Sequence, residues 1–175
     1  IPYDDNGHGS HCAGVAAGAG FVRKDPQGRA VVTVISENLT TDKPFEYYLL
    51  SSFNASAIGT ISIDIEWYQA GGQGDILQQV FLFYGNSRDP TEWTTKTSVS
   101  TPGENTTYTL SYTISSSSEY GFYHVVALIA NNSLRNGVNI RMIEHYPFSD
   151  VDSYPLLTGQ AFNASLVGIK VLDKS

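Results

Sequence analysis

The chain has 175 residues, of which 41% are hydrophobic and only 15% charged, and its formal net charge is −7. Aromatic residues make up 12% of it, which is not the composition of a disordered chain. The acidic charge argues against nucleic-acid binding, which requires basic patches. No apolar run approaches the roughly 20 residues that a membrane-spanning helix needs. We therefore expect no nucleic-acid partner and no membrane span in this chain.

The predicted elements change in character along the chain. Residues 8–20, HGSHCAGVAAGAG, are almost all small, which is typical of an element packed closely against a neighbour. From residue 30 onward, apolar and polar residues alternate and β-branched and aromatic residues are frequent, which predicts strands. The expected strands span residues 30–36, 45–50, 57–67, 77–84, 106–114, 120–130 and 138–144. Turn-rich segments separate them without any amphipathic helix, so we predict an antiparallel, jelly-roll-like β-sandwich.

The strands differ in how they alternate. In the third one, Ile61, Ile63 and Ile65 share one face, while polar side chains occupy the other. Residues 77–84 are apolar on both faces, which predicts a central strand. Residues 165–172, SLVGIKVL, form one continuous apolar run of the kind that is buried on both faces in a parallel α/β sheet. The two ends of the chain therefore look like parts of one protein, and the middle looks like another.

Cysteine and asparagine indicate the compartment. Cys12 is the only cysteine, which excludes an intrachain disulfide and a CxxC metal site. Asn-x-Ser/Thr acceptors for glycosylation occur five times, where about two are expected by chance. They are Asn38, Asn54, Asn105, Asn131 and Asn163. This excess favours a secreted or cell-surface glycoprotein.

One motif carries chemistry. Residues 5–18 read DNGHGSHCAGVAAG and resemble the histidine-bearing segment of subtilisin-like serine proteases. The resemblance implies that His8 is the general base, which accepts a proton from a serine and then donates it to the leaving amine. We expect His11 to pack on the same helix and Cys12 to be a buried small hydrophobe.

The C-terminal segment agrees with this resemblance. Residues 159–173, GQAFNASLVGIKVLD, are similar to the core strand that follows the histidine helix in that family, with departures at Gln160 and Asn163. The resemblance implies three parts: a histidine-helix segment at 1–20, an inserted β-sandwich at 21–157 and a core-strand segment at 158–175. The predicted fold is thus mainly β, with a short helix and a strand of an α/β subtilisin-like core flanking the insert.

The family's catalytic apparatus is incomplete in this chain. The aspartate of the triad would precede Ile1 and the serine would follow Ser175, so we expect this chain alone to be inactive. The parent protein would be a secreted endopeptidase without a cofactor, whose partners are a protein or peptide substrate and the rest of the protease domain. The insert would aid substrate recognition or limit access. The alternative is a non-catalytic binding or adhesion module within a degenerate protease.

Other candidates remain open within the insert. Asp64, Glu66 and Asp75 suggest either a calcium site or solvated strand and turn acids, because the dense acidic spacing of a calcium loop is absent. Two segments, 74–84 and 119–126, resemble the bacterial pre-peptidase C-terminal module. Several aromatic residues could form a platform for sugar or peptide, or pack in the sandwich. They are Trp67, Tyr68, Trp93, Tyr108, Tyr112, Tyr120 and Tyr123.

Overall fold

The computed structural model describes residues 23–69, 75–131 and 137–149. Residues Arg23–Ser149 form one compact unit. Its strands are β1 (Arg23–Lys24), β2 (Ala30–Leu39), β3 (Phe45–Ala55), β4 (Gly59–Gln69), β5 (Ile76–Tyr84), β6 (Thr94–Ser100), β7 (Tyr108–Ile114), β8 (Gly121–Ala130) and β9 (Val138–Tyr146). Two three-residue 3₁₀ helices, η2 (Pro90–Glu92) and η3 (Ser117–Glu119), are the helices of the described ranges, and neither could span a bilayer.

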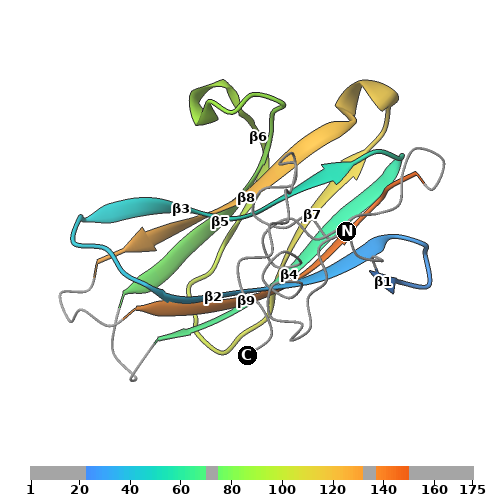
Figure 1. Ribbon diagram of the computed structural model, residues 1–175. Coiled ribbons are helices and arrows are strands. Elements are labelled where there is room, and N and C mark those ends of the chain that lie inside the picture. The colour runs from blue at the N-terminus through green and yellow to red at the C-terminus, as the bar shows by residue number, and fades with distance from the viewer. Residues whose placement is uncertain (1–22, 70–74, 132–136, 150–175) are drawn as a thin grey trace, which may run out of the picture. The chain divides into compact units, whose positions relative to one another are not determined.

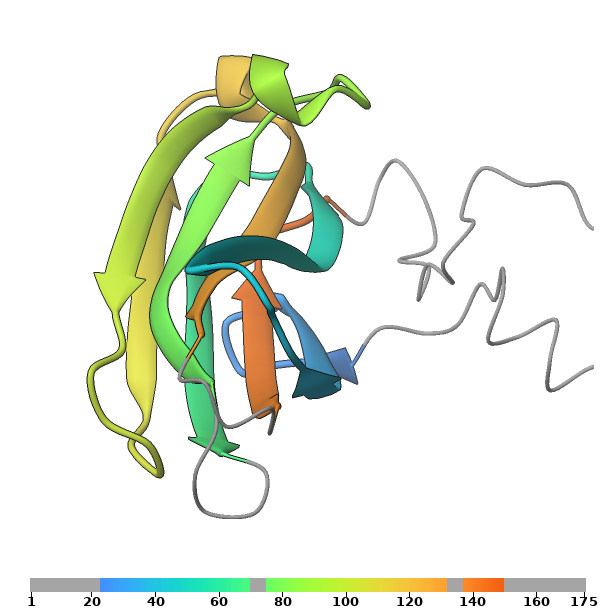
Figure 2. The same ribbon diagram turned by 90° about the vertical axis from the view of Figure 1, so that its left-hand side faces the viewer.

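The strands form two antiparallel sheets packed face to face (Figures 1 and 2). One sheet has the order β1-β2-β9-β4-β7 and the other the order β3-β8-β5-β6. Successive strands from β2 to β9 alternate between the sheets, except that β5 and β6 are neighbours in one sheet. This is the strand arrangement of a jelly roll, which is built from two Greek keys. The prediction of a mainly β, jelly-roll-like sandwich is therefore confirmed.

The core lies between the two sheets. Ile61, Ile63 and Ile65 of β4 are fully buried on one side, as their alternation predicted. Val80 and Leu82 of β5 face them from the other sheet and are equally buried. These side chains remove their whole apolar surface from water, which is the main force holding two such sheets together.

Two strands were not predicted from the sequence. β6 reads TTKTSVS and lacks the large apolar residues that mark a half-buried strand. It is an edge strand, and its backbone pairing with β5, from Gln79↔Ser100 to Tyr84↔Thr94, stabilises it. β1 has two residues and exists only through its pairing with β2. The expected helix after His8 and the expected strand at residues 165–172 lie outside the described residues.

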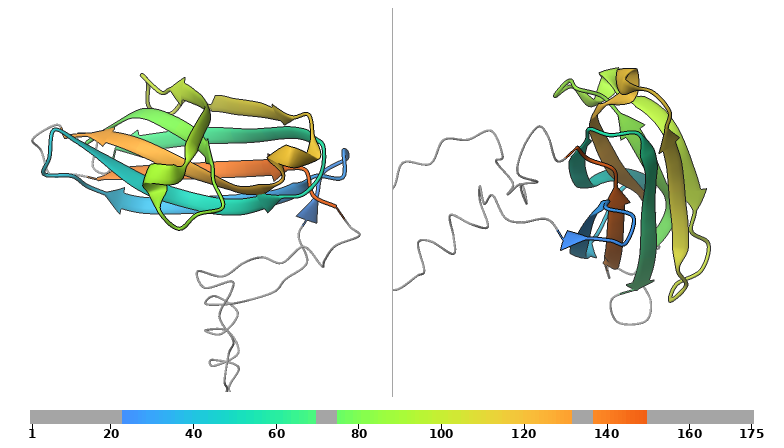
Figure 3. Two further views of the ribbon diagram at one scale, coloured as in Figure 1. Left: turned by 90° about the horizontal axis from the view of Figure 1, so that it is seen from above. Right: turned by 90° about the vertical axis from the view of Figure 1, so that its right-hand side faces the viewer.

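The chain enters and leaves the sandwich at the same end (Figure 3). β2 lies between β1 and β9, so that Ala30 pairs with Lys24 on one side and with Tyr146 on the other. The Lys24 ammonium lies 5.1 Å from the centroid of the Phe148 ring. The first and last strands of the unit are thus both paired with β2, and a cation–π contact joins Lys24 to Phe148, just after β9.

Candidate functional site

The catalytic candidate from the sequence, His8, lies outside the described residues, together with His11 and Cys12. The candidate sites that follow are those of the described ranges of the sandwich. They are an outward sheet face, a histidine stacked on a tryptophan, an aspartate–histidine pair where the chain enters and leaves the sandwich, and a hollow beside that pair.

An apolar surface covers the outer side of the four-stranded sheet. Because side chains alternate along a strand, the buried Val80, Leu82, Val125 and Ala127 leave their neighbours directed outward. The strand register then places these neighbours side by side, with Tyr47 opposite Leu128 and with Val126 between Leu49 and Phe81. We name this surface the aromatic face; its members are Tyr47, Leu49, Phe81, Phe83, Val126 and Leu128.

The rings of the aromatic face form a row across the strands. The Tyr47 and Phe81 centroids are 6.0 Å apart, and those of Phe81 and Phe83 are 5.8 Å apart. Trp93 continues the row at 6.3 Å from Phe83. Tyr47 is 63% exposed and Leu49 is 58% exposed, whereas Phe81 and Phe83 are half-buried. Contiguous apolar surface of this kind is typical of a binding site.

The two outer faces of the sandwich differ in their charged residues. On the five-stranded sheet, Asp64, Glu66 and Arg141 point outward, and Glu66 and Arg141 form an ion pair at 3.6 Å. The outward positions of the four-stranded sheet that the register aligns include no Asp, Glu, Lys or Arg. Among these positions are Phe45, Tyr47, Leu49, Gln79, Phe81, Phe83, Ser98, Ser100, His124, Val126 and Leu128. An uncharged face on a chain of net charge −7 suits an uncharged ligand.

His124 lies at one end of the aromatic face, stacked on Trp93 with 3.7 Å between the ring centroids. Its Nε2 is 2.9 Å from the Gly85 carbonyl oxygen and its Nδ1 is 2.8 Å from Ser52 Oγ. A carbonyl only accepts, so Nε2 carries the proton and Nδ1 accepts a hydrogen bond from the serine. Burial lowers the pKa of the imidazole, although the bond to Gly85 opposes this shift.

The loop around η2 positions Trp93 over the imidazole. Asp89 caps η2 by accepting a hydrogen bond of 2.9 Å from the Thr91 backbone N–H. The indole Nε1 donates to the Ser87 carbonyl at 2.8 Å. A Cβ on Gly85 would lie 2.4 Å from the Trp93 ring, so glycine is required where the ring passes the backbone. A serine hydrogen-bonded to an imidazole resembles an activated nucleophile. Here, however, both ring nitrogens of His124 are hydrogen-bonded within the sheet, to Ser52 and to Gly85, and these bonds hold the ring in place.

Asp25 and His145 meet where the chain enters and leaves. His145 Nδ1 lies 3.0 Å from Asp25 Oδ2, which also accepts a 2.7 Å bond from Arg29 Nε. Burial alone would raise the pKa of Asp25, but hydrogen bonds from the Arg29 backbone and from the His145 and Arg29 side chains lower it to about 2. The carboxylate is therefore ionised at neutral pH and His145 Nδ1 is the donor. Within the described ranges no hydroxyl or thiol hydrogen-bonds to His145, so this pair is a tie between strands.

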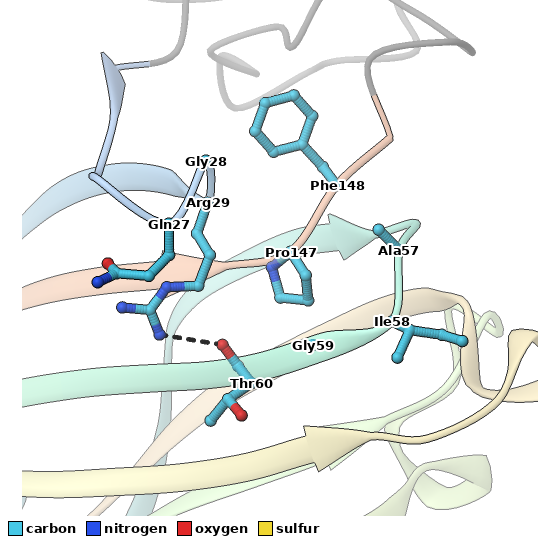
Figure 4. A pocket seen from close by; sticks show the side chains of 9 residues that line it. All are labelled: Gln27, Gly28, Arg29, Ala57, Ile58, Gly59, Thr60, Pro147 and Phe148. Atoms are coloured by element: carbon cyan, nitrogen blue, oxygen red, sulfur yellow. Dashed lines mark hydrogen bonds between the residues drawn. The ribbon is translucent and has the colours of Figure 1, made fainter.

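A hollow of about 490 Å³ lies beside this tie (Figure 4). Arg29 crosses it and donates from Nη1 to the Thr60 carbonyl at 3.2 Å. Gly59 lies at its floor with φ +148°, and a Cβ there would meet Pro147 at 3.0 Å. The remaining lining residues are Gln27, Gly28, Ala57, Ile58 and Phe148. The hollow thus separates the β1–β2 turn from the start of β4.

The acids that suggested calcium have other partners. Asp64 accepts a bond of 2.7 Å from Thr109 Oγ1, and Glu66 accepts one of 2.8 Å from Thr107 Oγ1. Asp75 is buried and accepts from the Thr41 backbone at 2.8 Å. The described residues contain no group of three His, Cys, Asp or Glu side chains placed to hold a metal ion.

The aromatic candidates divide into core and surface. Trp67 and Tyr123 are buried in the core. Tyr68 is 49% exposed, on the outer side of the five-stranded sheet. Trp93 alone joins the ring row of the aromatic face. Glu144 and His145 are adjacent in sequence but lie on opposite sides of β9: Glu144 is buried between the sheets, whereas His145 points outward. Of the sequons, Asn38, Asn54 and Asn105 are exposed, and Asn131 donates to the Thr41 carbonyl.

Sequence reasoning missed the aromatic face. Phe81 and Phe83 indicated a central strand with two apolar sides, which is correct. An apolar run in the sequence does not show whether another part of the protein packs against the second side. The alternation of Phe45, Tyr47 and Leu49 with Glu46 and Tyr48 contained the missing information, because it predicts an outward apolar stripe on the neighbouring strand. Only the register joins the two stripes.

Comparison with known proteins adds little to this geometry. No protein-family model and no curated protein sequence matches the chain. Among solved structures, the structure of infectious bursal disease virus Gx strain aligns with a TM-score of 0.40 and 12% sequence identity. The alignment covers 78% of this chain and 38% of that one, so this chain spans less than half the length of its structural neighbour.

Proposed function

We propose that the chain is part of a secreted subtilisin-like serine endopeptidase, in which the sandwich is an inserted domain that recognises the protein substrate. In the parent protein His8 would be the general base between an aspartate and a serine supplied by the flanking sequence. The motif at residues 5–18 and the segment at residues 159–173 support this proposal.

The observation that carries the proposal for the sandwich is the proximity of its two ends. A domain inserted into a loop of another protein must begin and finish at nearly the same place, because the host loop supplies two adjacent attachment points. Lys24 and Phe148 are in contact, and β1 and β9 flank the same strand. This geometry supports an insert and does not depend on the sequence motif.

A His8→Ala change in the full-length parent tests the catalytic part. Peptidase activity on a small chromogenic peptide is expected to fall by about 10⁴-fold or more, as it does when a triad member is lost. The matched control is His11→Ala, three residues away in the same motif, which is expected to retain activity. Full activity of the His8→Ala variant would sink the assignment.

Deletion of residues 23–149, with a short Gly-Ser linker in their place, tests the recognition part. The deleted parent is expected to cleave the small peptide at the normal rate and a folded or extended protein substrate more slowly. Equal rates on the protein substrate would show that the sandwich has no part in recognition.

A binding or adhesion module is the second candidate, and the aromatic face is the observation that favours it. The sequences beyond Ile1 and Ser175 distinguish the two candidates directly. A complete enzyme requires a catalytic aspartate upstream and a serine in a Gly-Thr-Ser-Met-Ala context downstream. If either is missing, the sandwich is an adhesion module.

A further inference from the structure

Strand β3 is an open edge of the four-stranded sheet. The sheet order places β8 on one side of β3 and no further strand of the described residues on the other. An edge strand exposes a row of backbone N–H and C=O groups that another extended chain can complete.

The direction of these groups follows from the contact at the start of the strand. The Pro44 carbonyl accepts a bond of 3.2 Å from the Asn131 N–H, so residue 44 is directed toward β8. Backbone groups of successive residues in an antiparallel strand point to opposite sides. Phe45, Tyr47 and Leu49 therefore direct their N–H and C=O groups away from β8, toward the open edge.

Two other edges of the sandwich lie against each other, whereas no described strand pairs with the outer edge of β3. β6 and β7 lie against each other and close the sandwich on that side (Figure 2). β1 pairs only with Ala30 and Val31, so the later part of β2 is also an edge. Between Phe45 and Leu49 there is no Lys or Pro, and the one charged residue, Glu46, is ion-paired with Lys43 at 2.8 Å. The register shift at Leu50 ends the regular part of the edge.

The exposed side chains specify what fits beside the edge. Phe45, Tyr47 and Leu49 are 59%, 63% and 58% exposed, and all three lie on the uncharged outer face. A strand added next to β3 would place its own outward side chains beside them, where apolar and β-branched residues pair best. An oligosaccharide could cover the rings but could not complete a row of amide and carbonyl groups.

We propose that the edge of β3 from Phe45 to Leu49 binds an extended, uncharged segment of a polypeptide as an added strand. The inference rests on the proposed function in identifying this polypeptide with the protease substrate. Backbone hydrogen bonds supply the affinity, and Tyr47 and Leu49 select apolar side chains in the bound segment.

Fluorescence anisotropy with the full 175-residue chain tests this inference. The probe is a fluorescein-labelled, acetylated heptapeptide of alternating Thr and Val. A matched probe carries N-methyl groups on every second amide, which removes the donors along one edge and leaves the side chains unchanged. The unmodified peptide is expected to bind about tenfold or more tightly than its methylated counterpart, because several backbone hydrogen bonds are lost. Equal binding of the two peptides would overturn the inference.

Three variants locate the site. Leu49→Lys places a charge on the edge, and Tyr47→Pro removes an N–H that β8 does not use, so the fold should tolerate it. Each is expected to weaken binding about tenfold or more. Ile35→Lys is the matched control, since Ile35 is 64% exposed on the other sheet, and binding should be unchanged. Circular dichroism establishes that all three variants fold.

Two further outcomes would overturn the inference in favour of another occupant. If sedimentation shows a dimer that Leu49→Lys dissociates, the edge binds a second copy of the chain. If fluorescein-labelled cellohexaose binds and the unmodified peptide does not, the surface binds neutral sugar. Peptide binding does not require peptidase activity, so an inactive parent with intact binding rejects only the protease assignment, and an active parent without binding rejects only this inference.

Discussion

Asp25 and His145 lie 120 positions apart in the sequence, and their side chains meet at 3.0 Å between Oδ2 and Nδ1. Arg29 completes the cluster, with Nε at 2.7 Å from the same carboxylate oxygen. The Asp25 carboxylate therefore joins the β1–β2 turn to β9. This contact links the place where the chain enters the sandwich to the place where it leaves. These three side chains, which we call the clasp, join the segment before β2 to the strand that ends the unit.

Replacing Asp25 tests the clasp. Asp25→Asn is expected to lower the free energy of unfolding by about 1–3 kcal/mol, because charge-assisted bonds to Arg29 and His145 are lost. The wild-type contribution is complete above the ordinary pKa of 3.8 and disappears as the pH falls through about 2. Thermal unfolding between pH 2 and 5 measures both effects. Asp64→Asn, which loses only a bond from Thr109 on an exposed face, should change stability less.

Glu144 is expected to make the protein less stable at high pH. It is 2% exposed between the sheets and accepts a hydrogen bond from Ser51 Oγ. Burial raises its pKa from 4.5 to about 7, although the bond from Ser51 opposes the shift. The folded protein therefore retains the proton over a range where the unfolded chain has released it, and stability falls as the pH rises from 4.5 through 7.

The variant Glu144→Gln removes this titration while keeping the size of the side chain. At pH 8 it should be more stable than the wild type by about 2–3 kcal/mol, and at pH 4 the difference should nearly vanish. Urea unfolding at the two pH values measures it. Glu66→Gln makes the same substitution on the exposed outer face and is the matched control. A Glu144→Gln variant that is less stable at pH 8 would contradict the assignment.

Trp93 is expected to control the environment of His124. Trp93→Ala removes the ring stacked at 3.7 Å and admits water to the imidazole. Because burial lowers the pKa of His124, the variant should raise that pKa toward its ordinary value of 6.5. An NMR titration of the imidazole proton measures the shift. The loss of stability should be about 2–3 kcal/mol, since the indole is half-buried.

Trp93→Phe is the matched variant for this prediction. It keeps a flat ring over His124 but loses the 2.8 Å bond from Nε1 to the Ser87 carbonyl. Its histidine pKa should stay close to that of the wild type, while its stability drops by about 1 kcal/mol. Equal pKa values in all three proteins would show that the strands, and not the indole, desolvate the imidazole.

The sequence by itself determined the architecture of the middle of the chain. Alternation along a strand is a local property, so Ile61, Ile63 and Ile65 were identified as core residues before any strand was paired. The motif around His8 is equally local, and the catalytic role that it implies is a proposal. β6 was missed for the same reason, because TTKTSVS has no local signal and becomes a strand only through pairing with β5.

Tertiary structure alone decided where the surfaces lie. The aromatic face needs the register that brings Tyr47 and Phe81 within 6.0 Å across three strands. The open edge of β3 needs the order of the sheet, and the clasp needs Asp25 and His145 to meet across 120 residues. The sequence shows which residues along a strand are apolar and how they alternate. Pairing between distant strands determines which apolar side is buried and which is exposed to a partner.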